Sequence, residues 1–139
     1  MVITASLAGY IDMPRGPLYA SSKWALRGLL HSLRWTTAEV GMRVNMIAPA
    51  FVKTAIISPE VQETLTKGGM PWATAEDAAK AVLHISSDAN INGRTLAIVP
   101  RVVSEDGYLD LCEDDFNDGE RLTEWQRAYG GVAQWDSLN

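Results

Sequence analysis

The sequence predicts an α/β fold with about three parallel strands, flanking helices and an irregular acidic tail. Short apolar runs at residues 1–5 and 42–48 lie on either side of a long segment, 18–40, in which apolar residues recur every three or four positions. A third apolar run at 95–99 follows a second helical pattern. A strand, a long helix and another strand form a βαβ unit, in which the two strands are parallel.

The first elements have local start and stop signals. The strand at 1–5 ends at Ser6 and leads into a loop that contains several glycines and prolines. The helix at 18–40 ends before Gly41, a residue type that commonly terminates helices. The next strand, 42–48, ends at Pro49, because proline lacks the N–H that a central strand needs.

The later elements are less regular. Residues 51–70 contain breakers and are interpreted as a loop with one or two short helices. Thr74, followed by two acidic residues, is typical of a helix start. A turn at Asn92-Gly93 precedes the last strand, and helical spacing indicates a terminal helix near 119–129.

Composition limits the class of protein. The chain has 139 residues, 47% of them hydrophobic, a net charge of −5 and one cysteine. Its length accommodates one domain, its apolar content argues against disorder, and it has no apolar run of membrane-spanning length. No secretory leader is visible, so the expected location is cytoplasmic.

The charge divides the chain into two parts. Residues 1–104 have a net charge of +3, whereas residues 105–139 have a net charge of −8. We therefore expect a folded domain at 1–104 and an acidic, tryptophan-containing tail at 105–139, in which 110–120 is a solvated linker. Neither part has a basic and aromatic patch for nucleic acid.

Three polar residues are candidates for chemistry. Tyr19 and Lys23 lie four positions apart in the predicted helix and therefore project from one face. An ammonium group near a phenol favours the phenolate, which suits the phenol for general acid–base catalysis. Ser6 follows a strand, at the edge where ligands bind in open α/β sheets. His31 and His84 do not have the spacing of metal ligands, and no metal is expected.

Three motifs in order resemble the short-chain dehydrogenase/reductase family. They are the Ser-Leu-Ala-Gly block at Ser6, the YxxxK block from Tyr19 to Lys23, and the Asn-Met-Ile-Ala-Pro-Ala-Phe-Val-Lys-Thr block that begins at Asn45. The residues of the first and third blocks resemble those of the hydroxyprostaglandin dehydrogenase-like subgroup. The resemblance covers residues 1–99 and implies the carboxyl-terminal half of a Rossmann-type, doubly wound fold.

The resemblance also implies roles for individual residues. Tyr19 would be the catalytic acid or base, Lys23 would assist it and bind the nicotinamide ribose, and Ser6 would orient the substrate oxygen. The segment after Pro49 would cover the nicotinamide, with the Val52 backbone and the Thr54 hydroxyl as contacts. The implied activity is NAD- or NADP-dependent interconversion of a small-molecule alcohol and a ketone.

Two departures from the family pattern affect the cofactor. Ala50 stands where the family usually has glycine, which would strain the loop if the site requires a positive φ. The sequence also has no glycine-rich βα turn for the pyrophosphate. We therefore expect a truncated chain that starts in the family's fifth strand and lacks the dinucleotide-binding half and the catalytic asparagine.

Two alternatives remain open. In the first alternative to a dehydrogenase, the chain is a truncated paralogue without redox activity that acts as a binding or scaffolding partner. In the second, it is a cofactor-independent isomerase or cyclase that uses Tyr19 and Lys23. The family's use of the 18–40 helix between subunits also implies a homo-oligomer, or pairing with a full-length relative.

Overall fold

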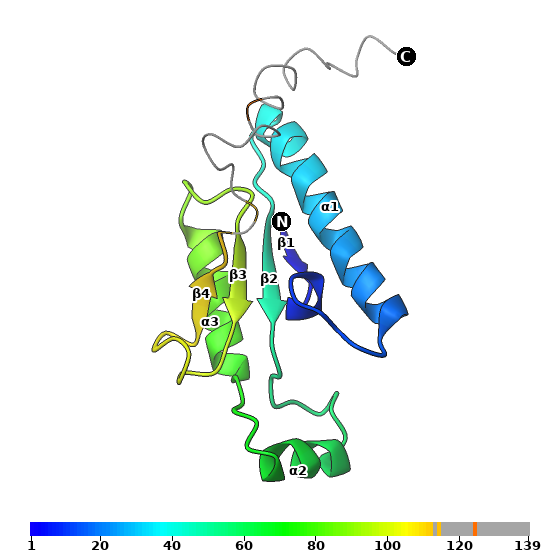
Figure 1. The fold of residues 1–139 in the computed structure, drawn as a ribbon. Helices are drawn as coiled ribbons and strands as arrows, with labels where there is room; N and C mark the ends of the chain where they lie inside the picture. Colours follow the sequence, from blue (N-terminus) through cyan, green and yellow to red (C-terminus); the bar gives the residue numbers. More distant parts are fainter. Residues whose placement is uncertain (113, 115–123, 125–139) are drawn as a thin grey trace.

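A computed structural model describes residues 1–112, 114 and 124 of the chain (Figure 1). One sheet has the strand order β1 (Val2–Thr4), β2 (Asn45–Pro49), β3 (Thr95–Ile98) and β4 (Tyr108–Asp110). The first three strands are parallel and β4 is antiparallel to β3. The helices are a short 3-10 helix η1 (Leu7–Gly9), α1 (Pro17–Glu39), α2 (Pro59–Lys67) and α3 (Ala75–Ser87).

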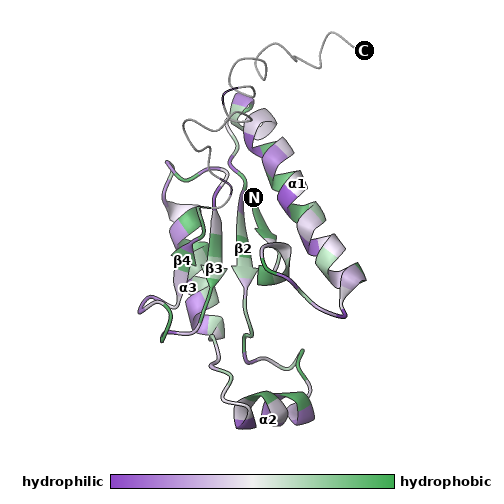
Figure 2. Ribbon diagram, viewed as in Figure 1, coloured by the Kyte–Doolittle hydropathy of each residue, from purple (hydrophilic) through white to green (hydrophobic). Residues whose placement is uncertain are grey.

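The central strand β2 separates two hydrophobic cores. Because side chains alternate along a strand, Met46 and Ile47 point to opposite faces of the sheet. Met46 packs with Leu30 of α1, whereas Ile47 packs with Ile85 of α3. The two helices therefore cover opposite faces, as in a doubly wound sheet, and β2 and β3 are hydrophobic over most of their residues after a polar first one (Figure 2).

The ends of α1 follow the local signals in the sequence. Pro17 occupies the first turn, where its missing N–H costs no hydrogen bond, and Gly41 has a φ of +71° just beyond the end. The N–H of Gly41 donates to the Ala38 carbonyl at 3.1 Å. No helix among the described residues is both long and apolar enough to cross a membrane.

The start of α3 is a capped N-terminus, as predicted. The Thr74 hydroxyl accepts from the Asp77 N–H at 3.1 Å and donates to the Asp77 carboxylate at 2.7 Å. Arg101, from the turn after β3, donates to the same carboxylate at 2.7 Å. These contacts hold the pKa of Asp77 at about 2, with the Arg101 hydrogen bond as the largest cause.

The structure extends the sheet into the segment that the sequence assigns to the acidic tail. Residues Tyr108–Asp110 form β4, which pairs with β3 after a tight turn at Gly107. Asp114, expected in a solvated linker, is only 5% exposed. That expectation is wrong for Asp114 because its carboxylate is surrounded by hydrogen-bond donors, described below. The predicted terminal helix at 119–129 lies outside the described residues, apart from residue 124.

Candidate functional site

Ser6 and Pro49 meet at the carboxyl edge of the parallel strands. Ser6 follows β1 and Pro49 ends β2, and parallel neighbours finish at the same edge. The Ser6 hydroxyl donates to the Pro49 carbonyl at 3.4 Å and accepts from the Ala8 N–H at 3.2 Å. Ser6 therefore caps η1 and contacts the end of the neighbouring strand.

Tyr19 and Lys23 lie together on the first turns of α1. The Lys23 ammonium is 5.4 Å from the centroid of the Tyr19 ring, and the Tyr19 side chain is 46% exposed. A ring this exposed is accessible to a ligand, which suits a group that exchanges a proton with a substrate.

Gly9 packs between the strand end that carries Ser6 and the helix that carries Tyr19 and Lys23. A Cβ on Gly9 would lie 2.9 Å from the Lys23 carbonyl oxygen, closer than a side chain tolerates. The missing side chain therefore lets η1 pack directly on the α1 backbone. Through this packing the strand end with Ser6 lies against the helix that carries Lys23.

Val52 and Thr54 lie on the segment between β2 and α2. Val52 forms a parallel bridge with Ala73, in which Lys53 N–H donates to the Ala73 carbonyl at 3.2 Å. The two groups that bond to Ala73 are the Phe51 carbonyl and the Lys53 N–H, which flank Val52 on its strand. The Val52 peptide groups therefore face away from Ala73. The Thr54 carbonyl accepts from the Gln62 side chain of α2 at 3.0 Å.

Ala50 causes no strain at this position. Among the described residues, the non-glycine residues with positive φ are Arg15 and Cys112. Ala50 therefore has an ordinary backbone conformation, and its N–H donates to the Ile98 carbonyl at 2.9 Å. The strain expected for an alanine in place of the family's glycine is absent at Ala50.

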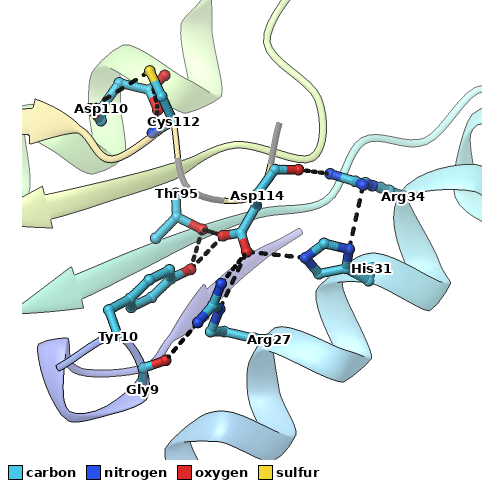
Figure 3. Close-up of polar contacts among 9 residues, drawn as sticks. All are labelled: Gly9, Tyr10, Arg27, His31, Arg34, Thr95, Asp110, Cys112 and Asp114. Carbon is cyan, nitrogen blue, oxygen red and sulfur yellow. Dashed lines mark hydrogen bonds and ion pairs between the residues drawn. The ribbon is translucent and has the colours of Figure 1, made fainter. Parts of the chain in front are cut away.

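A polar cluster around Asp114 was not singled out by the sequence (Figure 3). The Asp114 carboxylate accepts from Arg27 Nε and Nη2 at 3.1 Å and from His31 Nε2 at 2.9 Å. Its other oxygen accepts from the Tyr10 hydroxyl at 2.5 Å and the Thr95 hydroxyl at 3.0 Å. We call these five residues the Asp114 cluster.

The residue spacing in α1 indicates the helical side of this cluster. Arg27 follows Lys23 by four residues and His31 follows Arg27 by four, so a polar stripe extends along one helix face. The other side had no signal, because Asp114 is one of eight acidic residues between Glu105 and Glu120. Local pattern does not indicate which of these acids is buried.

The cluster stabilises the charged form of Asp114. Burial opposes ionisation, but the hydrogen bonds from His31 and Tyr10 and the Arg27 charge outweigh it and hold the pKa of Asp114 well below its usual range. Burial, followed by the hydrogen bond to Asp114, raises the pKa of the Tyr10 phenol. The carboxylate is therefore a fixed negative charge between the sheet and α1. The described residues contain no group of three or more His, Cys, Asp or Glu that could hold a metal.

Comparison with known proteins finds similarity to one family. Residues 1–65 match the family model described as short chain dehydrogenase. The chain is 35% identical over 124 residues to 5'-hydroxyaverantin dehydrogenase of Dothistroma septosporum, an alignment that covers 86% of this chain and 39% of that protein.

Two solved structures are similar to this chain over most of its length. The 3-hydroxyacyl-CoA dehydrogenase type-2 from Mycobacterium avium aligns with a TM-score of 0.61 and 29% identity, over 69% of this chain and 39% of that chain. The protein ElxO with NADP bound aligns with a TM-score of 0.59 and 25% identity, over 74% and 46% of the two chains.

Over the matched residues the chain is therefore similar to the short-chain dehydrogenase/reductase family, a family of oxidoreductases. The predicted partial Rossmann-type fold is thereby confirmed. The chain spans 39% of the length of the curated relative. Assignment to the hydroxyprostaglandin dehydrogenase-like subgroup, and a domain boundary after residue 104, stay predictions.

Proposed function

We propose that this chain carries the catalytic residues of an NAD(P)-dependent oxidoreductase that interconverts an alcohol and a ketone. Tyr19 is the proton donor and acceptor, Lys23 assists it from one turn further along α1, and Ser6 orients the substrate oxygen. The packing of Gly9 on the Lys23 backbone is the observation that carries the proposal, since it joins the element with Ser6 to the helix with Tyr19 and Lys23.

The Ser6 hydroxyl suits the role of a substrate ligand. Its bond to the Pro49 carbonyl is long, at 3.4 Å, so a substrate oxygen can replace the carbonyl at little cost. Its acceptor side is already used by the Ala8 N–H, which leaves the hydroxyl proton for the ligand. The substrate oxygen would then lie between a hydrogen-bond donor and the Tyr19 phenol.

The segment after β2 fits the nicotinamide end of a dinucleotide. The Val52 N–H and C=O face away from their strand partner, and together they match the donor and acceptor of a carboxamide. Pro49 and the Thr54 hydroxyl complete this side. The cofactor, when bound, accepts or supplies the hydride. ElxO, whose structure holds NADP, supports this cofactor class.

The cofactor assignment predicts selective binding of half a dinucleotide. We expect nicotinamide mononucleotide to bind weakly, at millimolar concentration, with saturation transfer to its nicotinamide protons, and AMP to show none. Lys23→Ala reduces the transfer, whereas Lys80→Ala on α3 is the matched control. Equal transfer to both nucleotides, or none to either, contradicts the proposed nicotinamide site.

The chemistry is tested in a chimaera. Residues 1–112 replace the matching segment of the Dothistroma septosporum relative, which supplies the rest of the chain. We expect alcohol oxidation with NAD(P) that falls at least a hundredfold on Tyr19→Phe, since the proton acceptor is lost. Tyr108→Phe, a phenol on β4, leaves turnover unchanged. A folded chimaera that keeps its turnover with Tyr19→Phe contradicts the assignment.

A second proposal concerns association through α1. Leu18 and Leu29 are exposed on this helix, at 88% and 45%, and a Cβ on Gly28 would meet no atom within 4 Å. We propose that this face pairs with a second copy or with a full-length relative. Light scattering after size exclusion would show a dimer that Leu18→Glu dissociates and Val102→Glu does not. A monomer contradicts self-association.

A further inference from the structure

The Asp114 cluster is connected to Ser6 through η1. Arg27, which binds Asp114, also donates through Nη1 to the Gly9 carbonyl at 3.0 Å. Its guanidinium stacks over the Tyr10 ring, 4.1 Å from the centroid. Gly9 is the last residue of η1 and Tyr10 follows it, so Arg27 and Asp114 hold the carboxyl end of η1 (Figure 3).

The other end of η1 is the Ser6 cap. Besides the hydroxyl contact with Ala8, the Ser6 carbonyl accepts from the Gly9 N–H at 3.0 Å, and the Leu7 carbonyl accepts from the Tyr10 N–H at 2.8 Å. These hydrogen bonds make η1 one short rigid unit between Ser6 and Tyr10. A displacement of Gly9 or Tyr10 is therefore transmitted to the Ser6 backbone and to its Ala8 contact.

A single turn of 3-10 helix is not stable alone. Three residues gain few hydrogen bonds against the cost of ordering the backbone, so tertiary contacts decide whether the turn persists. The contacts at its carboxyl end form two sets, the packing of Gly9 and Tyr10 on α1 and the apolar core, and the polar contacts of the Asp114 cluster. The second set depends on Asp114, which belongs to the segment after β4 and lies 87 positions from Arg27.

Burial and charge give this contact strength. The side chain of Asp114 is 4% exposed and that of Arg27 is 17% exposed. Removing the carboxylate would leave the Arg27 guanidinium partly buried without its ion partner and the Thr95 hydroxyl without its acceptor. The Tyr10 hydroxyl would keep only the Thr95 hydroxyl, at 2.9 Å, as an acceptor.

From these contacts we infer that Asp114 and Arg27 are positioning residues for Ser6: the carboxyl-terminal segment fixes η1, and η1 orients the hydroxyl at the candidate active site. Neither residue is catalytic, because each acts through Gly9 or Tyr10. The inference rests on the proposed function only for the role of Ser6. The anchoring of η1 is testable without cofactor or turnover.

Amide hydrogen exchange measured by NMR on the full chain tests the anchoring. We expect Asp114→Asn to accelerate exchange of the Gly9 and Tyr10 N–H groups about tenfold, the factor for losing one hydrogen bond of ordinary net strength. The Met46 N–H, which donates to the Arg94 carbonyl at 2.9 Å in the core, keeps its rate. Asp110→Asn is the matched control, since Asp110 is an exposed carboxylate four residues earlier that pairs with Arg94.

A second variant covers the case in which Asp114→Asn does not fold. Arg27→Lys keeps a positive charge for Asp114 but loses the planar fork that reaches both Asp114 and Gly9. It is expected to accelerate the same two amides. Unchanged exchange at Gly9 and Tyr10 overturns the inference, and so does equal acceleration of Met46, which indicates general destabilisation.

The turnover test separates the inference from the proposed function. In the chimaera extended to include Asp114, Asp114→Asn lowers kcat several-fold with little change in the KM for cofactor, because Ser6 is displaced and the nicotinamide contacts are not. If Tyr19→Phe does not lower turnover, the proposed function is wrong, but the amide exchange result for Gly9 and Tyr10 still supports the anchoring of η1. A kcat unchanged by Asp114→Asn, in a protein that needs Ser6, overturns the positioning role.

Discussion

Gly107 is a position at which a single methyl group should be costly. It lies in the turn before β4 with a φ of +76°. A Cβ there would overlap Cγ of Asp77 and lie 2.5 Å from the Asp77 Cβ and Oδ2. Asp77 cannot move aside freely, because Arg101 and Thr74 bind its carboxylate.

The cost of Gly107→Ala has two parts. Left-handed backbone strain contributes about 1–2 kcal/mol for a residue with a Cβ. Overlap with a fixed buried neighbour contributes about 1–3 kcal/mol more. We therefore expect the free energy of unfolding to fall by about 2–5 kcal/mol.

Gly69→Ala is the matched control. Gly69 has a φ of +79°, but a Cβ there meets no atom within 4 Å, so only the strain of about 1–2 kcal/mol applies. Urea unfolding followed by tryptophan fluorescence measures both variants. In an Asp77→Gly background, which removes the Asp77 Cβ as well as its carboxylate, the cost of Gly107→Ala should fall toward that of Gly69→Ala. Equal destabilisation by the two glycine variants would refute the steric argument.

Three further variants test the packing and electrostatics of the fold. Leu30→Ala, at a fully buried position, should cost about 2–5 kcal/mol, whereas Leu29→Ala at its exposed neighbour should cost less than about 1 kcal/mol; similar values in urea unfolding would contradict the assigned core. Thr74→Ala should cost about 1–2 kcal/mol by removing the α3 cap, and unchanged stability would show that the cap is unimportant. Arg101 lowers the pKa of Asp77 in the folded protein to about 2. The ionised Asp77 therefore makes its full contribution to stability above the unfolded pKa of about 3.9, and this contribution is lost as the pH falls toward 2. The midpoint of thermal unfolding should therefore change less with pH in that window for Asp77→Asn than for the unchanged protein. The same pH dependence in both proteins would contradict the pairing of Asp77 with Arg101.

The arrangement of the candidate site follows from the order of the strands. Ser6 and Pro49 come from consecutive parallel strands, which end at one edge, and α1 returns the chain between them. The site therefore combines two strand ends with the first turns of one helix. The Asp114 cluster lies on the α1 face beside it, because Thr95 pairs with Met46 in the register and shares its face.

The sequence by itself determined the elements whose signals are local. The Thr74 cap acts over three residues, Gly41 ends α1 within one turn, and the apolar periods identify β2 and both long helices. The motifs around Ser6, Tyr19 and Lys23 are equally short, so they indicated the family without any knowledge of contacts.

Only the tertiary structure decided the features that depend on distant partners. Strand β4 forms because β3 offers it a hydrogen-bonding partner and because Gly107 turns the chain back toward β3. The acidic sequence around β4 does not indicate this pairing. Asp114 is buried because Tyr10, Arg27 and His31, 83 to 104 positions away, converge on it. Local pattern reports hydrogen bonds and apolar spacing within a few residues, whereas the burial of a charge depends on which donors the fold brings to it.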